Sequence, residues 1–266
     1  MNNIDPILFL QPLASLLIGV IPLVYMKLKN KTSLWASLLI ASAAAYFSAI
    51  AAKVVLQYLT VRPLTAIIGQ GVPLAIYFGV QTSIFEVGFA YLVIRYASRK
   101  AKLDPRDGEF YGLGLAFWEN GVYLGALSLI NLLSIYLILQ SNSALAEQTY
   151  KILVSTNPAL FELPGKLLVP VAVSAVERIS SLLAHFSWGT LATLAVLTKR
   201  IRYLLYALPM GLVDTFAALY QFHIVRLLPT EVVVFVWSLA CFIITLMALR
   251  SSYVTPLKNR AAAAPA

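Results

Sequence analysis

Ionisable side chains interrupt a long apolar run between about residues 167 and 197. Glu177, Arg178 and His185 all lie inside this run. If the run crosses a lipid bilayer, each ionised side chain near the centre costs about 2.5–3.5 kcal/mol on insertion scales. On a helix, Arg178 and His185 share one face, and Glu177, Ser181 and His185 follow at steps of four along a neighbouring stripe. Two interpretations follow: a polar contact that pins helices together, or a buried polar site that handles water, a proton or a metal.

Polar residues also occur in three other apolar runs, as Glu86, the adjacent pair Glu119 and Asn120, and Asp214. Counting about 1.5 Å per residue from the basic end of each run places these residues about 14–21 Å from one membrane face. His185 comes to a similar depth by the same count. Isolated structural pairs need not agree in depth, so the agreement favours a shared polar site near the middle of the membrane.

The position of Glu177 and Arg178 differs from that of the other polar residues. They lie about two turns beyond His185, and we expect them nearer the outer leaflet. Singly, Glu86 and Asp214 also have structural interpretations, as a carboxyl group bonded to a neighbouring helix and as a helix cap or partner. Asn120 alone can form a hydrogen bond that joins two helices.

Composition defines the class of protein. The chain has 266 residues, of which 60% are hydrophobic and 12% charged. A soluble domain carries about 25% charged residues, so the chain is expected to be an integral membrane protein that contacts lipids. Its net charge of +9 does not indicate nucleic-acid binding, because the basic residues cluster at the ends of apolar runs.

Seven runs approach or exceed the roughly 20 residues that cross a bilayer. The sequence therefore predicts an all-α, multi-pass helix bundle. The first run lacks a small-residue cleavage site after it and is expected to be a retained helix. The predicted spans are residues 6–27, 33–59, 73–97, 109–139, 166–198, 203–224 and 231–250.

The distribution of basic residues predicts the orientation of the bundle. Fourteen of the 20 Lys and Arg residues fall on one side if seven helices alternate, which puts the N-terminus outside and the C-terminus in the cytoplasm. Lys53, Arg62, His223 and Arg226 fall near the outer ends, where we expect them to snorkel or face water.

The remaining segments define the expected domain organisation. Residues 1–260 are expected to form one membrane-embedded domain, and residues 261–266 (AAAAPA) a disordered or appended tail. The connection 140–165 is the only long one, and long segments of this kind are often lids or re-entrant pieces. The single cysteine, Cys241, excludes an internal disulfide.

Four motifs resemble those of a group of membrane proteases. The stretch Gly112 to Tyr123 reads GLGLAFWENGVY and resembles the Glu-Asn…Tyr helix of PrsW-type proteases. Glu177-Arg178 followed by His185 resembles the Glu-Arg…His helix of the related YhfC family. Glu86-Val87-Gly88 resembles the second Glu of an acidic motif, and Leu212-Val213-Asp214 the end of a His…Asp motif. The motifs follow the family order between about residues 80 and 216.

The resemblance implies peptide hydrolysis within the membrane, as in the wider group of CAAX-processing endopeptidases. A buried Glu can serve as general base for water, and a His can share this role or bind a metal. Glu86 or Glu119 would be the base, His185 would orient the water or ligate a metal, and Asn120 would stabilise the oxyanion. Glu177, Arg178 and Asp214 would support them.

The resemblance leaves the cofactor open between zinc and none. A zinc site of His185, Glu86 and Glu119 has the three protein ligands plus water of a catalytic centre. The chain departs from the family pattern at four positions, where Phe85 replaces a Glu, Phe89 an Arg, and Leu115 and Met210 each a His. Only one intramembrane His remains, so the zinc site would be unusual.

Three functions remain open at this stage. The first is an intramembrane endopeptidase acting on a membrane-associated protein or peptide. We expect it in a cell membrane, the plasma membrane of a prokaryote. The second is an inactive relative that acts as a scaffold, with a protein partner or as a homo-oligomer. The third is a small proton-coupled transporter, in which the buried Glu, His and Asp residues form a relay. The absence of an inverted sequence repeat counts against the transporter.

Overall fold

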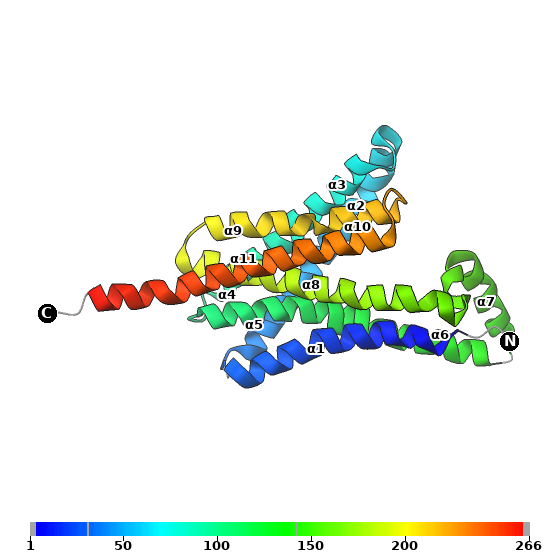
Figure 1. Ribbon diagram of the computed structural model, residues 1–266, viewed down its shortest axis with the longest axis horizontal. Helices are drawn as coiled ribbons and strands as arrows, with labels where there is room; N and C mark the ends of the chain where they lie inside the picture. Colours follow the sequence, from blue (N-terminus) through cyan, green and yellow to red (C-terminus); the bar gives the residue numbers. More distant parts are fainter. Residues whose placement is uncertain (1–3, 31, 142, 263–266) are drawn as a thin grey trace.

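The chain forms a bundle of long helices (Figure 1). The computed structural model describes residues 4–30, 32–141 and 143–262. These residues contain helices and no strand, and seven helical stretches are long and apolar enough to cross a membrane. The two termini lie at opposite ends of the long axis (Figure 1), as seven crossings require. The expected all-α bundle is therefore confirmed, while its orientation in the membrane stays a prediction.

The spans are built from one to three helical elements each. The first two are η1 (Pro6–Phe9) with α1 (Leu10–Asn30), and α2 (Trp35–Ile68). The third is α3 (Val72–Thr82), η2 (Ser83–Val87) and α4 (Gly88–Ala97). The fourth is α5 (Pro105–Ala116), η3 (Phe117–Leu127) and α6 (Ser128–Gln140). The last three are α8 (Pro164–Thr198); α9 (Arg202–Ala207), η5 (Leu208–Leu212) and α10 (Val213–Gln221); and α11 (Leu227–Ala262).

Helix α2 is longer than expected. The predicted span ended at residue 59, but the helix continues to Ile68 and contains Pro63. Proline is tolerated in membrane helices because neighbouring groups satisfy the freed backbone carbonyl. The end of α2 and the start of α3 project from one side of the bundle, at the top of Figure 1. The extra turns place the residues of α2 deeper than a helix ending at residue 59 would.

The long connection between the fourth and fifth spans is ordered. It contains α7 (Ala144–Thr156) and η4 (Pro158–Phe161). Leu160 and Phe161 pack on a small apolar cluster of Ile4, Leu8 and Leu167. α7 lies at the end of the bundle that also holds the start of α1 (Figure 1). The segment thus covers one end of α1 and α8.

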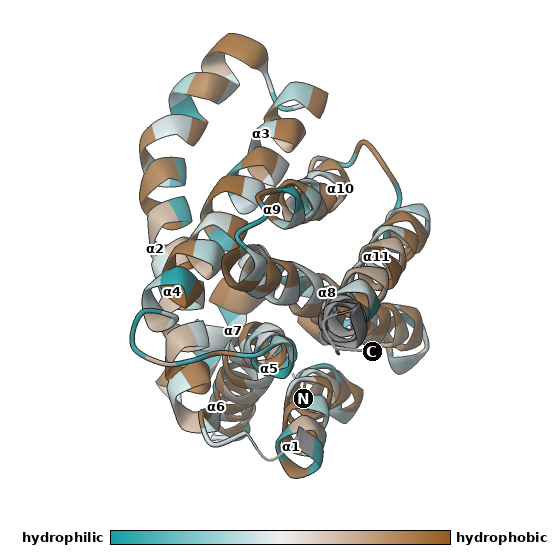
Figure 2. Cartoon of the chain, turned by 90° about the vertical axis from the view of Figure 1, so that its left-hand side faces the viewer, coloured by the Kyte–Doolittle hydropathy of each residue, from teal (hydrophilic) through white to brown (hydrophobic). Residues whose placement is uncertain are grey.

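Helix α8 is the central element, with α1, α4, α5, α9 and α11 packed around it. Figure 2 shows α8 enclosed by these helices in the view along the bundle. The closest approach is to α5, where a Cβ on Gly189 would lie 2.6 Å from the Cα of Gly112. Only glycine at both positions lets the two backbones touch, as small residues do in other membrane helix pairs.

The N-terminus of α5 is stabilised by hydrogen bonds in its first turn. The Asp104 side chain accepts hydrogen bonds from the backbone N–H groups of Arg106 and Asp107, and Asp107 accepts in return from Asp104 N–H. This capping box satisfies donors that a helix N-terminus leaves open. Of the expected tail, Ala261 and Ala262 end α11, and residues 263–266 lie outside the described residues. The single domain of residues 1–260 stays a prediction.

Candidate metal centre

The two candidate glutamates lie in π-helical segments, which the sequence did not indicate. Glu86 lies in η2 and Glu119 in η3. π-Helical turns are rare and often occur at functional sites, since the added residue per turn changes the direction in which side chains point. Each segment continues α-helically on both sides, so both spans widen locally at the glutamate.

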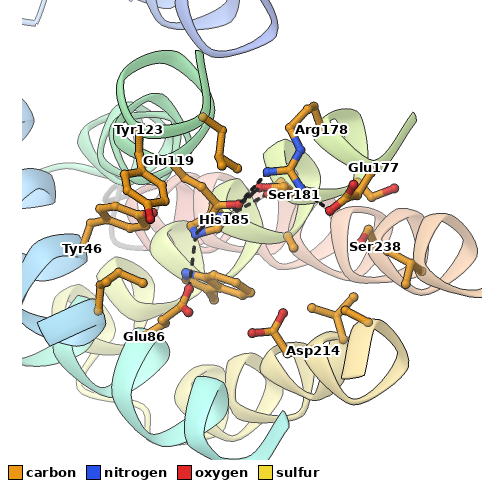
Figure 3. A pocket seen from close by; sticks show the side chains of 18 of the residues that line it. Tyr46, Glu86, Glu119, Tyr123, Glu177, Arg178, Ser181, His185, Asp214 and Ser238 are labelled. Carbon is orange, nitrogen blue, oxygen red and sulfur yellow. Dashed lines mark hydrogen bonds and ion pairs between the residues drawn. The ribbon is translucent and has the colours of Figure 1, made fainter. Parts of the chain in front are cut away.

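His185 joins the two glutamates. Its Nε2 atom lies 3.0 Å from Glu119 Oε2 and 3.4 Å from Glu86 Oε2. One donor atom from each of the three residues lies within 4.8 Å of the other two. His185 is 3% exposed, and Figure 3 shows its ring beside Glu119. Residues from three spans thus form one cluster, in which Glu86 and His185 are buried and Glu119 is partly exposed.

The imidazole of His185 is oriented by its own helix. Nδ1 lies 2.9 Å from the backbone carbonyl of Ser181. A carbonyl oxygen can only accept a hydrogen bond, so Nδ1 is the donor. In the neutral ring the lone pair is then on Nε2, the atom that faces Glu86 and Glu119. This is how a metal-ligating histidine is usually held.

The cluster fits a divalent metal ion. His185 Nε2 is buried and has no hydrogen-bond partner of good geometry among the described residues, although two carboxylate oxygens lie near it. A cation between the three atoms would satisfy all of them. One imidazole nitrogen and two carboxylate oxygens suit zinc and other first-row divalent metals. The chemistry and geometry of these donors therefore fit a metal.

The second oxygen of Glu119 is held by the residues beside His185 on α8. Oε1 accepts from Arg178 Nη1 at 3.1 Å and from Ser181 Oγ at 2.9 Å. The other Nη atom of Arg178 donates to Glu177. Arg178 therefore reaches back to the cluster although it lies about two turns away along α8. Its guanidinium binds two carboxylates at once, as a planar fork allows.

Asn120 has a different environment from the one the resemblance implied. Its Nδ2 donates to the backbone carbonyl of Arg178 at 3.0 Å, and its Oδ1 accepts from Arg178 Nη1 at 3.3 Å. Asn120 is fully buried and does not line the polar cavity that contains the cluster. The amide therefore ties η3 to α8, and the oxyanion role expected for Asn120 stays a prediction.

Glu86 is held by Lys53, and this corrects the expectation that Lys53 faces water at a membrane end. Lys53 Nζ lies 2.5 Å from Glu86 Oε1 and 3.2 Å from Asp214 Oδ2. Thr82 accepts from Lys53 at 2.7 Å and donates to Asp214. The predicted end of α2 at residue 59 put Lys53 too near the surface. With the helix running to Ile68, Lys53 lies in its middle.

A cavity of about 260 Å³ opens beside the cluster. Figure 3 shows its wall, to which every predicted site residue except Asn120 contributes. Residues that the sequence analysis did not single out also line it, among them Tyr46, Trp188, Glu231 and Ser238. Their types and spacing carried no signal, since each lies in an apolar run or at its end.

The side chains at the four positions where the chain departs from the family pattern make apolar contacts in the structure. Leu115 and Met210 are each 2% exposed and belong to the apolar core. Phe85 and Phe89 stack on each other, with ring centroids 6.5 Å apart. Among the described residues the cluster therefore has a single imidazole ligand.

Seven spans around a buried Glu–Glu–His cluster define a multi-pass membrane protein with a candidate metal centre. The model of the YhfC intramembrane metalloprotease family matches residues 14–236, which is most of the chain, and the chain belongs to this family. Searches of the curated proteins and of the solved structures gave no significant match. The family suggests a membrane protease that uses a metal.

Proposed function

We propose that the protein is an intramembrane endopeptidase that hydrolyses a membrane-associated protein or peptide, in the plasma membrane of a prokaryotic cell. The observation that carries the proposal is the convergence of Glu86, Glu119 and His185 on one point beside a cavity. Three ionisable groups from three helices, two of them buried and one partly exposed, are costly in a membrane, and such groups are by default functional. The family match supports the same reaction.

His185 and Glu119 are the residues that we assign to hold zinc throughout the reaction. They form the closer pair, and each is fixed by a second contact, from Ser181 to His185 and from Arg178 to Glu119. Bound zinc would supply a Lewis acid for the scissile carbonyl. Glu86 Oε2 lies at the longer distance, and we leave it free to take a proton.

Glu86 is the residue that we assign as general base. Its Oε2 lies farther from His185 Nε2 than that of Glu119, and Lys53 holds its other oxygen. A water beside Glu86 would lose its proton to Oε2 as it attacks the peptide carbonyl, and the same proton then passes to the leaving amine. Arg178, Glu177 and Asp214 act by positioning the two glutamates, and Asn120 by fixing Arg178.

The test is cleavage of membrane-spanning peptides by the protein in lipid nanodiscs, read by mass spectrometry of the products. Glu86→Gln should lower the rate by about 10²–10⁴, the usual contribution of a general base. Glu119→Gln should abolish cleavage and should release the metal as well. Glu147→Gln is the matched control, because Glu147 is exposed on α7 and pairs only with Lys151 in the described residues.

Two results would count against the proposal. One is cleavage by Glu86→Gln at the wild-type rate, which would show that Glu86 is not the general base. The other is the absence of cleavage for every peptide tested with the metal-loaded wild-type protein. The second result would favour the inactive scaffold, or the transporter if flux of protons were found.

A further inference from the structure

Helix α11 contributes two polar side chains to the wall of the cavity, Glu231 and Ser238. They are seven residues apart, so they lie on one helix face about 10 Å from each other along the axis. Glu231 is 9% exposed and Ser238 is fully buried. Figure 3 shows Ser238 on the side of the cavity opposite Tyr46.

Both side chains contain atoms without a partner. Glu231 Oε2 and Ser238 Oγ are buried, and neither makes a hydrogen bond within the described part of the chain. Hydroxyls elsewhere on α11 use the carbonyl one turn back, as Thr245 does with Cys241 at 2.9 Å. A buried polar group left unpaired costs about 1–3 kcal/mol. Two such groups on one face of a cavity point to a ligand that pairs with them.

The charges around the cavity show what kind of ligand Glu231 would bind. Five carboxylates line it: Glu86, Glu119, Glu177, Asp214 and Glu231. Each of the first four has an ion pair with Lys53, Arg178 or His185. Glu231 has none among the residues that the structure describes. Glu231 is not one of the three residues of the Glu86–Glu119–His185 cluster, so it is left to attract a cation.

A peptide substrate would provide partners for both groups. Cleavage requires a helical substrate to unwind, and in a membrane the freed backbone N–H and C=O groups need hydrogen-bond partners. A serine hydroxyl can donate and accept, so Ser238 can bind either backbone group. A lysine or arginine within a membrane segment needs an opposite charge, and Glu231 offers one.

We propose that Glu231 and Ser238 form a substrate subsite for a peptide with a lysine or arginine near the scissile bond. Glu231 pairs with the cationic side chain, and Ser238 bonds the unwound backbone. The inference rests on the proposed endopeptidase function and names the class of its substrate. It gives α11 the role of the substrate-binding wall, opposite the helices that carry the reacting groups.

The experiment measures binding and cleavage separately, with the full chain in nanodiscs of phosphatidylcholine, a lipid without a primary amine. The probes are fluorescent apolar peptides of about 20 residues, enough to span. In each peptide a single lysine occupies one position along the segment, and in its partner glutamine occupies the same position. Binding is read by fluorescence polarisation and cleavage by mass spectrometry.

At least one lysine peptide should bind the wild-type protein about tenfold more tightly than its glutamine partner, as expected for a hydrogen bond to a charged group. Glu231→Gln, which keeps the side-chain shape, should remove this preference. Glu231→Lys should reverse it toward a peptide with glutamate. Ser238→Ala should weaken the binding of the lysine and glutamine peptides by the same factor. Glu147→Gln should leave the binding of both peptides unchanged.

Equal binding of both peptides by the wild-type protein overturns the inference, as does a lysine preference that survives Glu231→Gln. Failure of the proposed function gives a different result. If the lysine preference depends on Glu231 but no peptide is cleaved, the subsite stands and the endopeptidase function fails. If peptides are cleaved without a lysine preference, the function stands and the subsite fails.

Discussion

His185 Nε2 lies 3.0 Å from Glu119 Oε2, and Nδ1 of the same ring is held by the backbone carbonyl of Ser181, one turn earlier on α8. The helix itself therefore fixes the tautomer of His185, and the ring cannot turn away from the glutamates without losing this bond. A ligand fixed in this way reduces the entropy lost when a metal binds. His185 is the member of the centre whose geometry depends least on other side chains.

Removal of His185 should remove the metal. The wild-type protein should carry about one zinc per chain and His185→Ala much less, because the centre loses its only nitrogen ligand. Elemental mass spectrometry of the purified proteins measures the ratio. His223→Asn is the control: His223 is exposed and has a positive φ of 57°, which asparagine also adopts. Zinc that persists in His185→Ala, or disappears in His223→Asn, contradicts the assignment.

Arg178→Lys should weaken the metal site without removing a ligand. Arg178 binds Glu119 and Glu177 through its two Nη atoms, and a lysine cannot reproduce this fork. Loss of such an outer contact typically lowers metal affinity about 10–100-fold. Competition with a chromophoric zinc chelator gives the affinity. Arg226→Lys, at an exposed position, should leave it unchanged. Wild-type affinity in Arg178→Lys would show that the positive charge alone is enough, and an equal loss in both variants would show that the effect does not come from the fork of Arg178.

Much of the architecture could be predicted from the sequence because lipid imposes a length on each apolar run. The depth of Glu86, Glu119 and His185 followed from helix rise alone, and the structure brings all three together. The count was less accurate for Arg178, whose long side chain reaches the cluster from two turns away.

The remaining contacts depend on tertiary packing. The π-helical turns at Glu86 and Glu119 have no sequence signature, since the backbone adopts them to fit neighbouring helices. Lys53 was placed at a membrane end because α2 was predicted to end before Pro63, although the helix continues past it. Glu231, the first residue of the seventh predicted span, was not singled out in the sequence, and in the structure it lines the cavity.

Lys53→Met should destabilise the protein. The substitution removes the cation that Glu86 and Asp214 share, so both carboxylates lose this counter-charge inside the membrane. Breaking a buried pair in this way costs about 3–5 kcal/mol. Thermal unfolding in detergent, followed by a thiol-reactive dye on Cys241, measures the loss. Lys102→Met, at an exposed position between α4 and α5, should have little effect.

The triple variant Lys53→Met, Glu86→Gln, Asp214→Asn separates charge from packing. It removes the unpaired carboxylates together with the lysine, so most of the lost stability should return. If the triple variant is as unstable as Lys53→Met alone, the role of Lys53 is to fill space, and the charge network is not what stabilises Glu86.

Gly189→Ala should loosen the metal centre by separating α5 from α8. A Cβ on Gly189 would lie 2.6 Å from the Cα of Gly112, so one backbone has to move. Gly189 is one turn from His185, and Gly112 is two turns from Glu119, so the movement increases the distance between the two ligands. Overpacking of this kind costs about 1–3 kcal/mol.

Gly165→Ala on the same helix is the matched control, because a Cβ there has nothing within 4 Å. Zinc affinity and the unfolding temperature should both fall in Gly189→Ala and stay unchanged or rise slightly in Gly165→Ala, since alanine favours a helix. A Gly189→Ala protein with wild-type zinc affinity would show that the spacing of α5 and α8 does not set the geometry of the centre. Reduced zinc affinity would show that the glycine contact holds Glu119 and His185 at their distance.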